Sequence, residues 1–336
     1  MTKIFVNMRP DSATIERLEA PGNFKFDVIE EHIEGSRRDF DEARISNADV
    51  MFCDHPPANF DAMKQLKMIQ LASVGYTQLA GLELAEKEIQ ACNARGVFDV
   101  PIAEWNISML INLARDFRGM IRNQERGEWD RDARFQNEIR GATVGIWGYG
   151  GIGRETARMG KLLGLKIHAM TRSGPAKFSN IYGIPGTGDP NAELPDRFFT
   201  QDQKTKFLEG LDFLILAMPL SPATEGIIGE AELKTLPDHA CVLNPARGPL
   251  IQEAALLKAL NENWIAGAAL DTHYHYPMQP DHPLWKMPNV IMTPHISGSS
   301  GSPHFLTRVW DIFAQNLERL KTGELLLNEI DLKSVR

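Results

Sequence analysis

Short hydrophobic runs alternate with longer stretches of helical periodicity in the first hundred residues. The runs cover residues 3–7, 50–53, 68–72 and 89–93. Runs of this length separated by helix-like stretches are typical of buried parallel strands joined by crossover helices. The pattern therefore predicts a first α/β unit in this part of the chain.

The same alternation continues further along. Pro101 precedes a stretch with apolar residues at helical spacing, 102–118, which predicts a long linking helix. Helical stretches such as 253–261 then separate further predicted strands at 144–147, 166–170, 213–217, 240–244, 266–270 and 290–293. A last amphipathic helix, 303–321, comes too late to be needed by this second sheet. We therefore predict a continuous domain, 101–296, inserted into a discontinuous one, 1–100 and 297–336.

A glycine motif gives the second unit a chemical role. Gly148, Gly150 and Gly153 form GxGxxG after the apolar run 144–147 and before the helix-compatible stretch 154–163. Such glycines allow a tight turn, backbone approach to a pyrophosphate and close packing of helix on strand, with the phosphates at the helix N-terminus. The pattern alone is weak and also occurs in structural turns, but its strand–turn–helix context predicts dinucleotide binding.

The next predicted strand ends in Thr171, Arg172 and Ser173. An acidic residue near this point normally binds the ribose 2′-hydroxyl of NAD, whereas a guanidinium and hydroxyls suit the 2′-phosphate of NADP. We therefore predict NADP, with NAD as the other possible cofactor. The alternative for Arg172 is an exposed arginine at a strand end.

The composition limits the kinds of partner. The 336 residues carry a formal charge of −8, with basic and acidic residues mixed along the chain, so nothing indicates a nucleic-acid surface. No apolar run approaches the roughly 18 residues of a membrane span, and the start, MTKIFVNMRPD, does not resemble a signal peptide. We expect a cytoplasmic protein that binds small metabolites.

The positions of the cysteines and histidines also bear on the location of the protein and on metal binding. The cysteines lie far apart in strand-like contexts, which favours reduced core thiols, at Cys53, Cys92 and Cys241. Three histidines are close in sequence, but the residues between them leave no recognisable ligand set at His273, His275 and His282. We predict no metal site.

One predicted connection, 174–206, is unusually long. Loops of this length are usually functional or disordered. Arg197, Phe198 and Phe199 favour an ordered segment, which could cover the adenosine end of the cofactor or add to a subunit contact.

Two polar residues follow predicted strands of the second unit. Arg247, in the run LNPARGPLI, could hold a substrate carboxylate bidentately and polarise a neighbouring carbonyl. His295, in PNVIMTPHISGS, suits proton exchange with a ketone or alcohol oxygen because its pKa lies near neutrality. Both would lie at the carboxyl edge of the sheet, where open α/β sheets bind ligands. A surface arginine and a structural histidine are the alternatives.

Together with GxGxxG, the runs PLSPAT, NPARG, ALDT and TPHISG resemble the D-2-hydroxyacid dehydrogenase family, over nearly the whole chain. The resemblance implies an α/β fold of two doubly wound parallel-sheet domains, a Rossmann cofactor domain inserted into a flavodoxin-like substrate domain. It also implies an active site in the interdomain cleft and a homodimer formed through the cofactor domains. Glyoxylate and hydroxypyruvate reductases share this scaffold.

The resemblance also implies roles for individual residues. Arg247 matches the substrate-binding arginine, His295 the acid/base histidine and Asp271 the aspartate near the nicotinamide. The run SVGY resembles the carboxylate-binding loop, so the amides of Val74 and Gly75 would bind the substrate carboxylate and Tyr76 would contact its side chain. Further cofactor contacts are expected at Gly151, Ile152, Pro219, Thr224, Pro245, Ala246 and Gly298.

One position departs from the family pattern. The catalytic glutamate precedes the proline of the loop after ALD, but here Tyr276 precedes Pro277. A tyrosine hydroxyl can hydrogen-bond an imidazole, yet as a neutral group it stabilises imidazolium less than a carboxylate does. Formate dehydrogenases of the same superfamily carry glutamine here and a similar DHPLW run. The asparagine with which they bind formate is not evident near Phe98 and Asp99, so formate is a poor candidate.

Aromatic and imidazole side chains crowd this loop. His273, Tyr274, His275 and Tyr276, with Tyr76 and Trp285, could line a pocket for a larger or polar 2-oxo acid, or pack in a dimer. Three functional hypotheses follow from the sequence. The first is an NADP-preferring 2-oxo acid reductase with His295 as proton donor. The second is a cofactor sensor that has lost efficient chemistry, and the third is an enzyme of an unusual substrate that uses Tyr274 or Tyr276.

Overall fold

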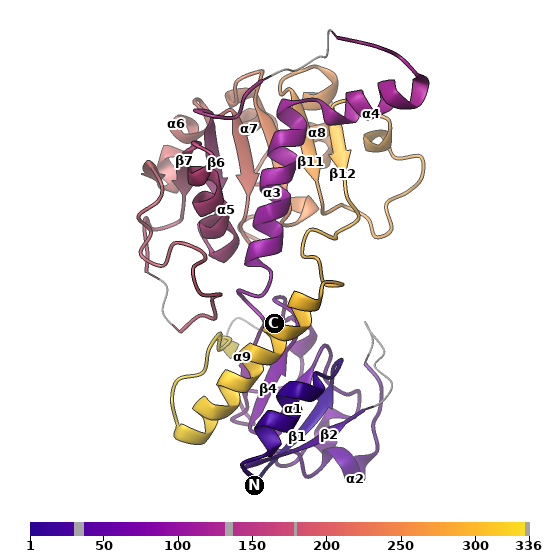
Figure 1. Ribbon diagram of the computed structural model, residues 1–336, viewed down its shortest axis with the longest axis vertical. Coiled ribbons are helices and arrows are strands. Elements are labelled where there is room, and N and C mark those ends of the chain that lie inside the picture. The colour runs from indigo at the N-terminus through magenta and orange to yellow at the C-terminus, as the bar shows by residue number, and fades with distance from the viewer. Residues whose placement is uncertain (30–36, 132–136, 178–179, 333–336) are drawn as a thin grey trace. The chain divides into compact units, whose positions relative to one another are not determined.

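The computed structural model describes residues 1–29, 37–131, 137–177 and 180–332, and its contacts divide the chain into two compact units (Figure 1). The first comprises Met1–Val97, Ser179–Ile184 and Ser300–Arg336, and the second Phe98–Phe178 and Pro185–Ser299. The second unit is thus inserted into the first, and it is itself interrupted by a short stretch of the chain that belongs to the first unit.

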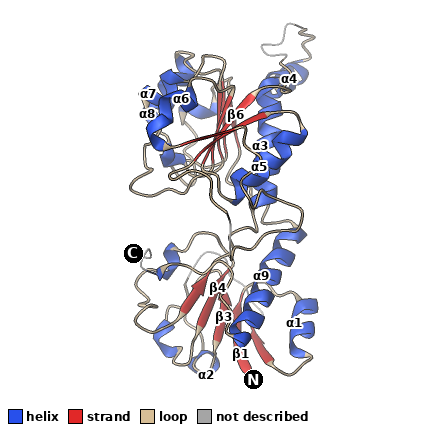
Figure 2. Cartoon of the chain, turned by 90° about the vertical axis from the view of Figure 1, so that its left-hand side faces the viewer, coloured by secondary structure: helices blue, strands red, loops and turns tan. Residues whose placement is uncertain are grey.

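The first unit is built on a parallel five-stranded sheet in the order β2-β1-β3-β4-β5. Every residue of β3 and β4 is buried, as expected for parallel strands covered on both faces. Helices α1 and α9 cover one face and the short α2 lies on the other (Figure 2). The elements are β1 (Thr2–Asn7), α1 (Ser12–Glu19), β2 (Phe24–Val28), α2 (Glu42–Ile45), β3 (Val50–Cys53), β4 (Met68–Leu71), β5 (Gln90–Cys92) and α9 (Pro303–Thr322).

The second unit holds a parallel seven-stranded sheet in the order β12-β11-β10-β9-β6-β7-β8. Helices α3 and α5 cover one face, and α6, α7 and α8 the other (Figure 2). Strand order reverses at β6, which carries the glycine motif at its carboxyl end. The elements are α3 (Asp99–Ala114), α4 (Phe117–Arg126), β6 (Thr143–Trp147), α5 (Gly151–Leu162), β7 (Lys166–Met170), β8 (Arg197–Phe199), α6 (Lys204–Leu208), β9 (Phe213–Leu216), α7 (Glu230–Thr235), β10 (Cys241–Asn244), α8 (Glu253–Asn261), β11 (Gly267–Leu270) and β12 (Val290–Met292).

The predicted fold class is confirmed, because both sheets are parallel and both carry helices on two faces. Three local features differ from the sequence prediction. The expected helix 102–118 ends at Ala114, since Asp116 adopts a left-handed conformation (φ 46°) and caps α4. Strand β2 was not predicted. Residues 197–199, expected to be an ordered part of the long loop, form β8 and extend the sheet beside β7.

Candidate active site

The glycine turn has the geometry that dinucleotide binding requires. Gly148 has φ 103°, and a β-carbon there would lie 2.6 Å from the backbone of Ala217. A β-carbon at Gly153 would lie 2.5 Å from the carbonyl oxygen of Gly148, so helix and strand pack through these two glycines. Gly150 is different, because no described residue beyond its chain neighbours lies within 4 Å of its missing β-carbon. The space above Gly150, at the N-terminus of α5, is therefore open to a phosphate.

The end of β7 lies next to this turn. Strands β6 and β7 pair in register up to Trp147 and Met170, so Thr171, Arg172 and Ser173 follow β7 beside the glycine motif. The Thr171 hydroxyl donates to the Gly174 carbonyl at 2.9 Å, whereas Arg172 and Ser173 are exposed. The guanidinium of Arg172 is thus presented at the edge of the sheet where the adenosine ribose of a bound dinucleotide would lie.

Asn244, the last residue of β10, shapes the loop that carries Arg247. Its side-chain oxygen accepts from the amides of Ala246 and Arg247 at 3.1 and 3.3 Å, and its side-chain nitrogen donates to the Arg247 carbonyl at 2.8 Å. These bonds close the loop and leave the Arg247 side chain exposed beyond the carboxyl end of the sheet. A β-carbon at Gly248 would lie 2.5 Å from the backbone of His273, so this loop packs against the one that follows β11.

Asp271 is fully buried at the end of β11 and organises the turn that carries His295. Its carboxylate accepts hydrogen bonds from the hydroxyls of Thr293 and Ser297, both at 2.5 Å, and from the amides of Ile296 and Ser297 at 2.9 and 3.0 Å. Its carbonyl accepts from the His295 amide at 2.8 Å. His295 adopts a left-handed backbone conformation (φ 57°), and this network fixes it there.

The environment of His295 lowers the pKa of its imidazole below the ordinary value. Loss of hydration is the largest cause, followed by the positive charge of Arg247. Asp271 acts in the opposite direction, and His273 lowers the pKa of His295 further. The side chains of Arg247 and His295 are therefore electrostatically coupled at one edge of the sheet.

Tyr276 lies over His295 but does not hydrogen-bond it. The two ring centroids are 5.6 Å apart, whereas the Tyr276 hydroxyl accepts from the backbone amide of His273 at 3.2 Å. The Tyr276–Pro277 peptide bond is cis, and 59% of the tyrosine remains exposed. Where the resemblance led us to expect a carboxylate, the imidazole thus has an aromatic neighbour of neutral charge.

The run SVGY belongs to the first unit, after β4. The Asn93 side chain donates to the Val74 carbonyl at 2.9 Å, and the Ser73 hydroxyl donates to that of Gly75 at 2.8 Å. Both carbonyls are therefore occupied. In the part of the chain that the structure describes, the amides of Val74 and Gly75 donate to no acceptor, and the ring of Tyr76 packs partly against the core of the first unit.

Comparison with known proteins decides the family. Residues 107–297, more than half of the chain, match the family described as "D-isomer specific 2-hydroxyacid dehydrogenase, NAD binding domain". The chain belongs to the D-isomer specific 2-hydroxyacid dehydrogenases. It is therefore an NAD(P)-dependent oxidoreductase of 2-hydroxy or 2-oxo acids, and the predicted family, enzyme class and nucleotide-binding domain are confirmed.

Individual relatives agree with this assignment. The chain is 32% identical over 280 residues to a glyoxylate reductase of Thermofilum pendens, covering 81% of this chain and 78% of that one. It is 28% identical over 342 residues to a glyoxylate reductase of Korarchaeum cryptofilum, covering 99% and 97%. An NADPH-dependent glyoxylate/hydroxypyruvate reductase of Sinorhizobium meliloti, solved with NADP and sulfate, shares the fold over the whole of both chains, with a TM-score of 0.75 and 21% identity.

The other predicted cofactor residues of this dehydrogenase lie in the second unit. The Thr224 hydroxyl donates to the Pro219 carbonyl at 2.8 Å and so holds the loop after β9 together. Pro245 and Ala246 belong to the Arg247 loop, Gly151 and Ile152 to the first turn of α5, and Gly298 to the His295 turn. All of these follow carboxyl ends of strands in one sheet, which is the edge where such sheets bind ligands.

The structure also shows site residues that the sequence did not reveal. Thr293 and Ser297 fix the Asp271 carboxylate, Trp105 of α3 donates to the Thr293 hydroxyl at 3.1 Å, and Asn93 holds the SVGY loop. The position of Thr293 and Ser297 on either side of His295 was a usable indication. Trp105 could not have been found, because 188 residues separate it from its partner.

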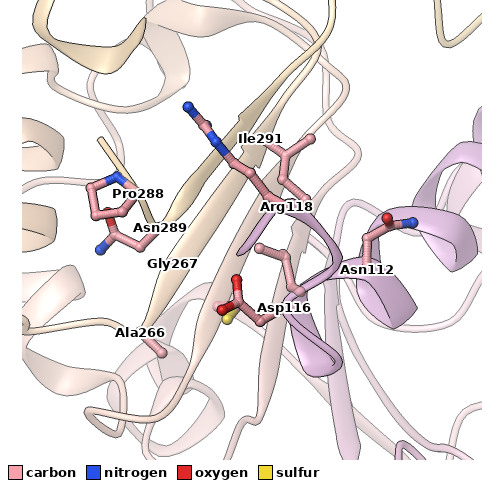
Figure 3. Close-up of a pocket in the computed structure, with 10 residues that line it drawn as sticks. Asn112, Asp116, Arg118, Ala266, Gly267, Pro288, Asn289 and Ile291 are labelled. Carbon is pink, nitrogen blue, oxygen red and sulfur yellow. The ribbon is translucent and has the colours of Figure 1, made fainter. Parts of the chain in front are cut away.

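A small cavity lies elsewhere in the second unit, at the amino-terminal edge of its sheet (Figure 3). Asn112 and Arg118 line it from one side, and Gly267, Asn289 and Ile291 from the strand side. Its volume is about 10 Å³, room for one water molecule. Among the described residues, no group of three or more metal-ligating side chains occurs, and no described helix is long and apolar enough to span a membrane.

Proposed function

We propose that this dehydrogenase is an NADP-preferring reductase that converts a 2-oxo acid of the glyoxylate or hydroxypyruvate type into a D-2-hydroxy acid. The observation that carries the proposal is the coupled pair of Arg247 and His295 at the sheet edge that also holds the glycine turn. One group can bind a carboxylate and the other can exchange a proton, which is what reduction of a 2-oxo acid requires. The glyoxylate reductases among the relatives support this substrate class.

The substrate carboxylate binds to Arg247 in this proposal. The guanidinium forms two parallel hydrogen bonds to the carboxylate, which fixes the plane of the substrate as well as its position. In the first unit, the amides of Val74 and Gly75 donate to no described acceptor, so each can bind a carboxylate, as the resemblance implies, with Tyr76 next to them. Binding by fixed donors also places the neighbouring carbonyl, so that part of the barrier is overcome by orientation.

His295 is the proton donor in this proposal. NADPH, when bound, supplies the hydride that adds to the carbonyl carbon of the substrate. The protonated imidazole of His295 donates its proton to the carbonyl oxygen, so the oxo acid becomes a hydroxy acid and the histidine becomes neutral. Asp271 keeps the histidine turn in place through its bonds to the residues on either side.

The open space above Gly150 fits a pyrophosphate, and the Arg172 guanidinium beside it suits a 2′-phosphate. Exchange of Arg172 for Ala should therefore raise the KM for NADPH at least tenfold and leave that for NADH almost unchanged, since a hydrogen-bonded charge pair contributes about 1.5–3 kcal/mol. Lys166→Ala, at the opposite end of β7, is the control. Equal losses with both cofactors would remove the phosphate assignment.

Two alternatives remain because Tyr276 replaces the expected carboxylate. In one, the protein senses the cofactor and turns over 2-oxo acids poorly. In the other, Tyr276 takes part in the chemistry of an unusual substrate, which its position 5.6 Å from the His295 ring favours. We further propose a homodimer formed through the cofactor domain, which the exposed apolar residues of α4 support. The buried free thiols favour a cytoplasmic location.

The deciding experiment measures NADPH and NADH oxidation with glyoxylate, hydroxypyruvate, pyruvate and phenylpyruvate between acid and neutral pH. We expect NADPH-dependent turnover that falls by roughly 10²–10⁴-fold in His295→Ala, the contribution of general acid catalysis. Tight NADPH binding without turnover would favour the sensor. Turnover that survives in His295→Ala but is lost in Tyr276→Phe would favour an enzyme of an unusual substrate that uses Tyr276.

A further inference from the structure

Thr293, two residues before His295, accepts hydrogen bonds from distant side chains at both its hydroxyl and its carbonyl. The indole nitrogen of Trp105, on α3, donates to the Thr293 hydroxyl at 3.1 Å. The Nε2 atom of His273, in the loop after β11, lies 2.8 Å from the Thr293 carbonyl oxygen. A carbonyl only accepts, so His273 is the donor there and carries its proton on Nε2. Two segments far apart in sequence therefore converge on this one residue.

The contacts of Thr293 continue directly to the catalytic turn. Its hydroxyl, which accepts from Trp105, donates to the Asp271 carboxylate at 2.5 Å. The three groups therefore form a chain of hydrogen bonds that all donate toward Asp271. Its carbonyl, which accepts from His273, also accepts from the His295 amide at 3.0 Å. Thr293 thus links the backbone of His295 to both Trp105 and His273, beside the direct bond of the His295 amide to the Asp271 carbonyl.

The orientation of the His295 ring depends on these backbone contacts. In the described part of the chain, no side chain hydrogen-bonds to the imidazole, and the hydroxyl of Tyr276 is engaged with the His273 amide instead. The left-handed conformation of His295 is one that a side-chain-bearing residue rarely adopts without external support. Thr293, together with Asp271, therefore holds the backbone from which the imidazole projects.

We propose that Trp105 and His273 are positioning residues, which clamp Thr293 and thereby aim the imidazole of His295. The inference rests on the proposed role of His295 as proton donor. A carboxylate at position 276 would both orient the imidazole and stabilise its protonated form. The clamp orients the imidazole but adds no negative charge beside it. Both residues act through Thr293 in this proposal, so we expect their effect on kcat and on the pH profile, and not on the KM for substrate.

Trp105→Phe is the most direct test, because it removes one hydrogen-bond donor and no charge. We expect kcat for 2-oxo acid reduction to fall about tenfold, since small misplacements of a catalytic group cost up to roughly 10²-fold, with the KM for NADPH and for substrate unchanged. His273→Phe should have a similar effect, and His273→Gln, which keeps a donor, should recover part of it. The double variant should lose less than the product of both single losses, because both act on Thr293.

Trp310→Phe is the matched control, since Trp310 also donates its indole N–H to a backbone carbonyl, that of Arg9, but in the first unit. Trp310→Phe can lower the stability of the protein without changing kcat or its pH profile. A loss of kcat in Trp310→Phe equal to that in Trp105→Phe would show a general structural effect and overturn the clamp. An unchanged kcat and pH profile in Trp105→Phe would overturn it as well.

A second readout is independent of turnover. In protein carrying ¹³C-labelled histidine, the His295 ring signal is assigned by its loss in His295→Ala and titrated by NMR. The groups that face His295 are Arg247, Asp271, His273 and Tyr276, all of which remain in Trp105→Phe. A freed, better hydrated imidazole should therefore titrate at higher pH, and an unchanged midpoint contradicts the clamp. If wild-type enzyme reduces no 2-oxo acid, the proposed function fails, and this titration still decides the clamp.

Discussion

At the scale of single residues, the charge around His295 decides the pH at which the enzyme can reduce its substrate. Reduction needs the protonated imidazole, which is populated only below its pKa. Lost hydration and the charge of Arg247 lower the pKa of His295, and Tyr276 offers no carboxylate to offset them. Reduction should therefore decline at lower pH than it would with an unperturbed histidine, and oxidation of the hydroxy acid should begin at lower pH.

Tyr276→Glu should reverse this behaviour. A carboxylate near the imidazole stabilises its protonated form, so the pKa of His295 should rise by about one unit, and the decline of kcat for reduction should move upward by the same amount. The onset of oxidation should also move to higher pH. The position tolerates the change because 59% of the tyrosine is exposed. The measurement is the pH profile of kcat in both directions.

Tyr276→Gln controls for the loss of the ring, since glutamine has the size of glutamate without its charge. We expect its pH profile to match the wild type, whatever happens to the maximal rate. A profile that moves equally in both variants would mean that the aromatic ring, and not the missing charge, sets the pKa of His295.

Residues whose role is local could be predicted from sequence, and residues whose role depends on distant contacts could not. Gly148, Gly153 and the position of Arg247 followed from strand ends and glycine spacing, and the structure places them at one sheet edge. The clamp on Thr293 could not be predicted, because one of its contacts spans 188 residues. Hydrophobic periodicity indicates which elements pack, but not which polar side chains meet.

At the scale of elements, the long connection after β7 is tied to the glycine motif by a buried arginine. Arg154 of α5 is 2% exposed and donates to the carbonyls of Tyr149, Asp189 and Ala176. The Asp189 carboxylate in turn accepts from the Tyr149 hydroxyl at 2.7 Å and from the amides of Glu193 and Leu194. The dinucleotide turn and the loop are therefore one hydrogen-bonded structure.

Arg154→Met should cost about 3 kcal/mol of stability, because it leaves buried carbonyls without a donor. The expected decrease in Tm is several degrees, measured by thermal unfolding, and the KM for NADPH should rise because the turn loses its support. Lys161→Met, on the same helix, breaks a partly exposed ion pair with Asp196 and should cost less than about 1 kcal/mol. Equal Tm values for the two variants would show that the arginine does not tie the loop to the turn.

Element boundaries show the limit of periodicity. The apolar spacing that predicted a helix over 102–118 continues across Asp116, where the backbone turns left-handed and α3 gives way to α4. The side chain of Asp116 caps α4 at the Gly119 amide, and neither glycine nor proline marks the break. Strand β8 escaped prediction because it is three residues long and is stabilised by its pairing with β7.

At the scale of the whole molecule, the expectation of one domain inserted into another came from the late helix at 303–321. Nothing in the sequence indicated that Ser179–Ile184 would join the first unit. Tyr182 is buried there and its amide donates to the Asn328 side chain at 3.0 Å, while the Asn328 amide donates to the Asn180 carbonyl. Contacts with Asn328 and with Gly96, both distant in sequence, hold this stretch in place, so its own sequence gives no indication of it.

Helix α4 of the cofactor unit exposes apolar side chains to solvent. No residue of α4 is buried, and Phe117 and Ile121, four positions apart and so on one face, are 45% and 52% exposed. Trp129, shortly after the helix, is 91% exposed. Exposed apolar side chains grouped in this way mark interaction surfaces. They support the proposed dimer, with α4 as its contact.

Ile121→Glu should therefore convert a dimer into a monomer, because a carboxylate in an apolar interface loses its hydration without gaining a partner. The measurement is mass by light scattering after size-exclusion chromatography, at several protein concentrations. Leu162→Glu is the matched control, since Leu162 is 76% exposed in the same unit but lies on α5. A wild-type monomer would refute the dimer. If both variants dissociate, the contact is not specific to α4. If Ile121→Glu remains a dimer, the face of α4 is not the dimer contact.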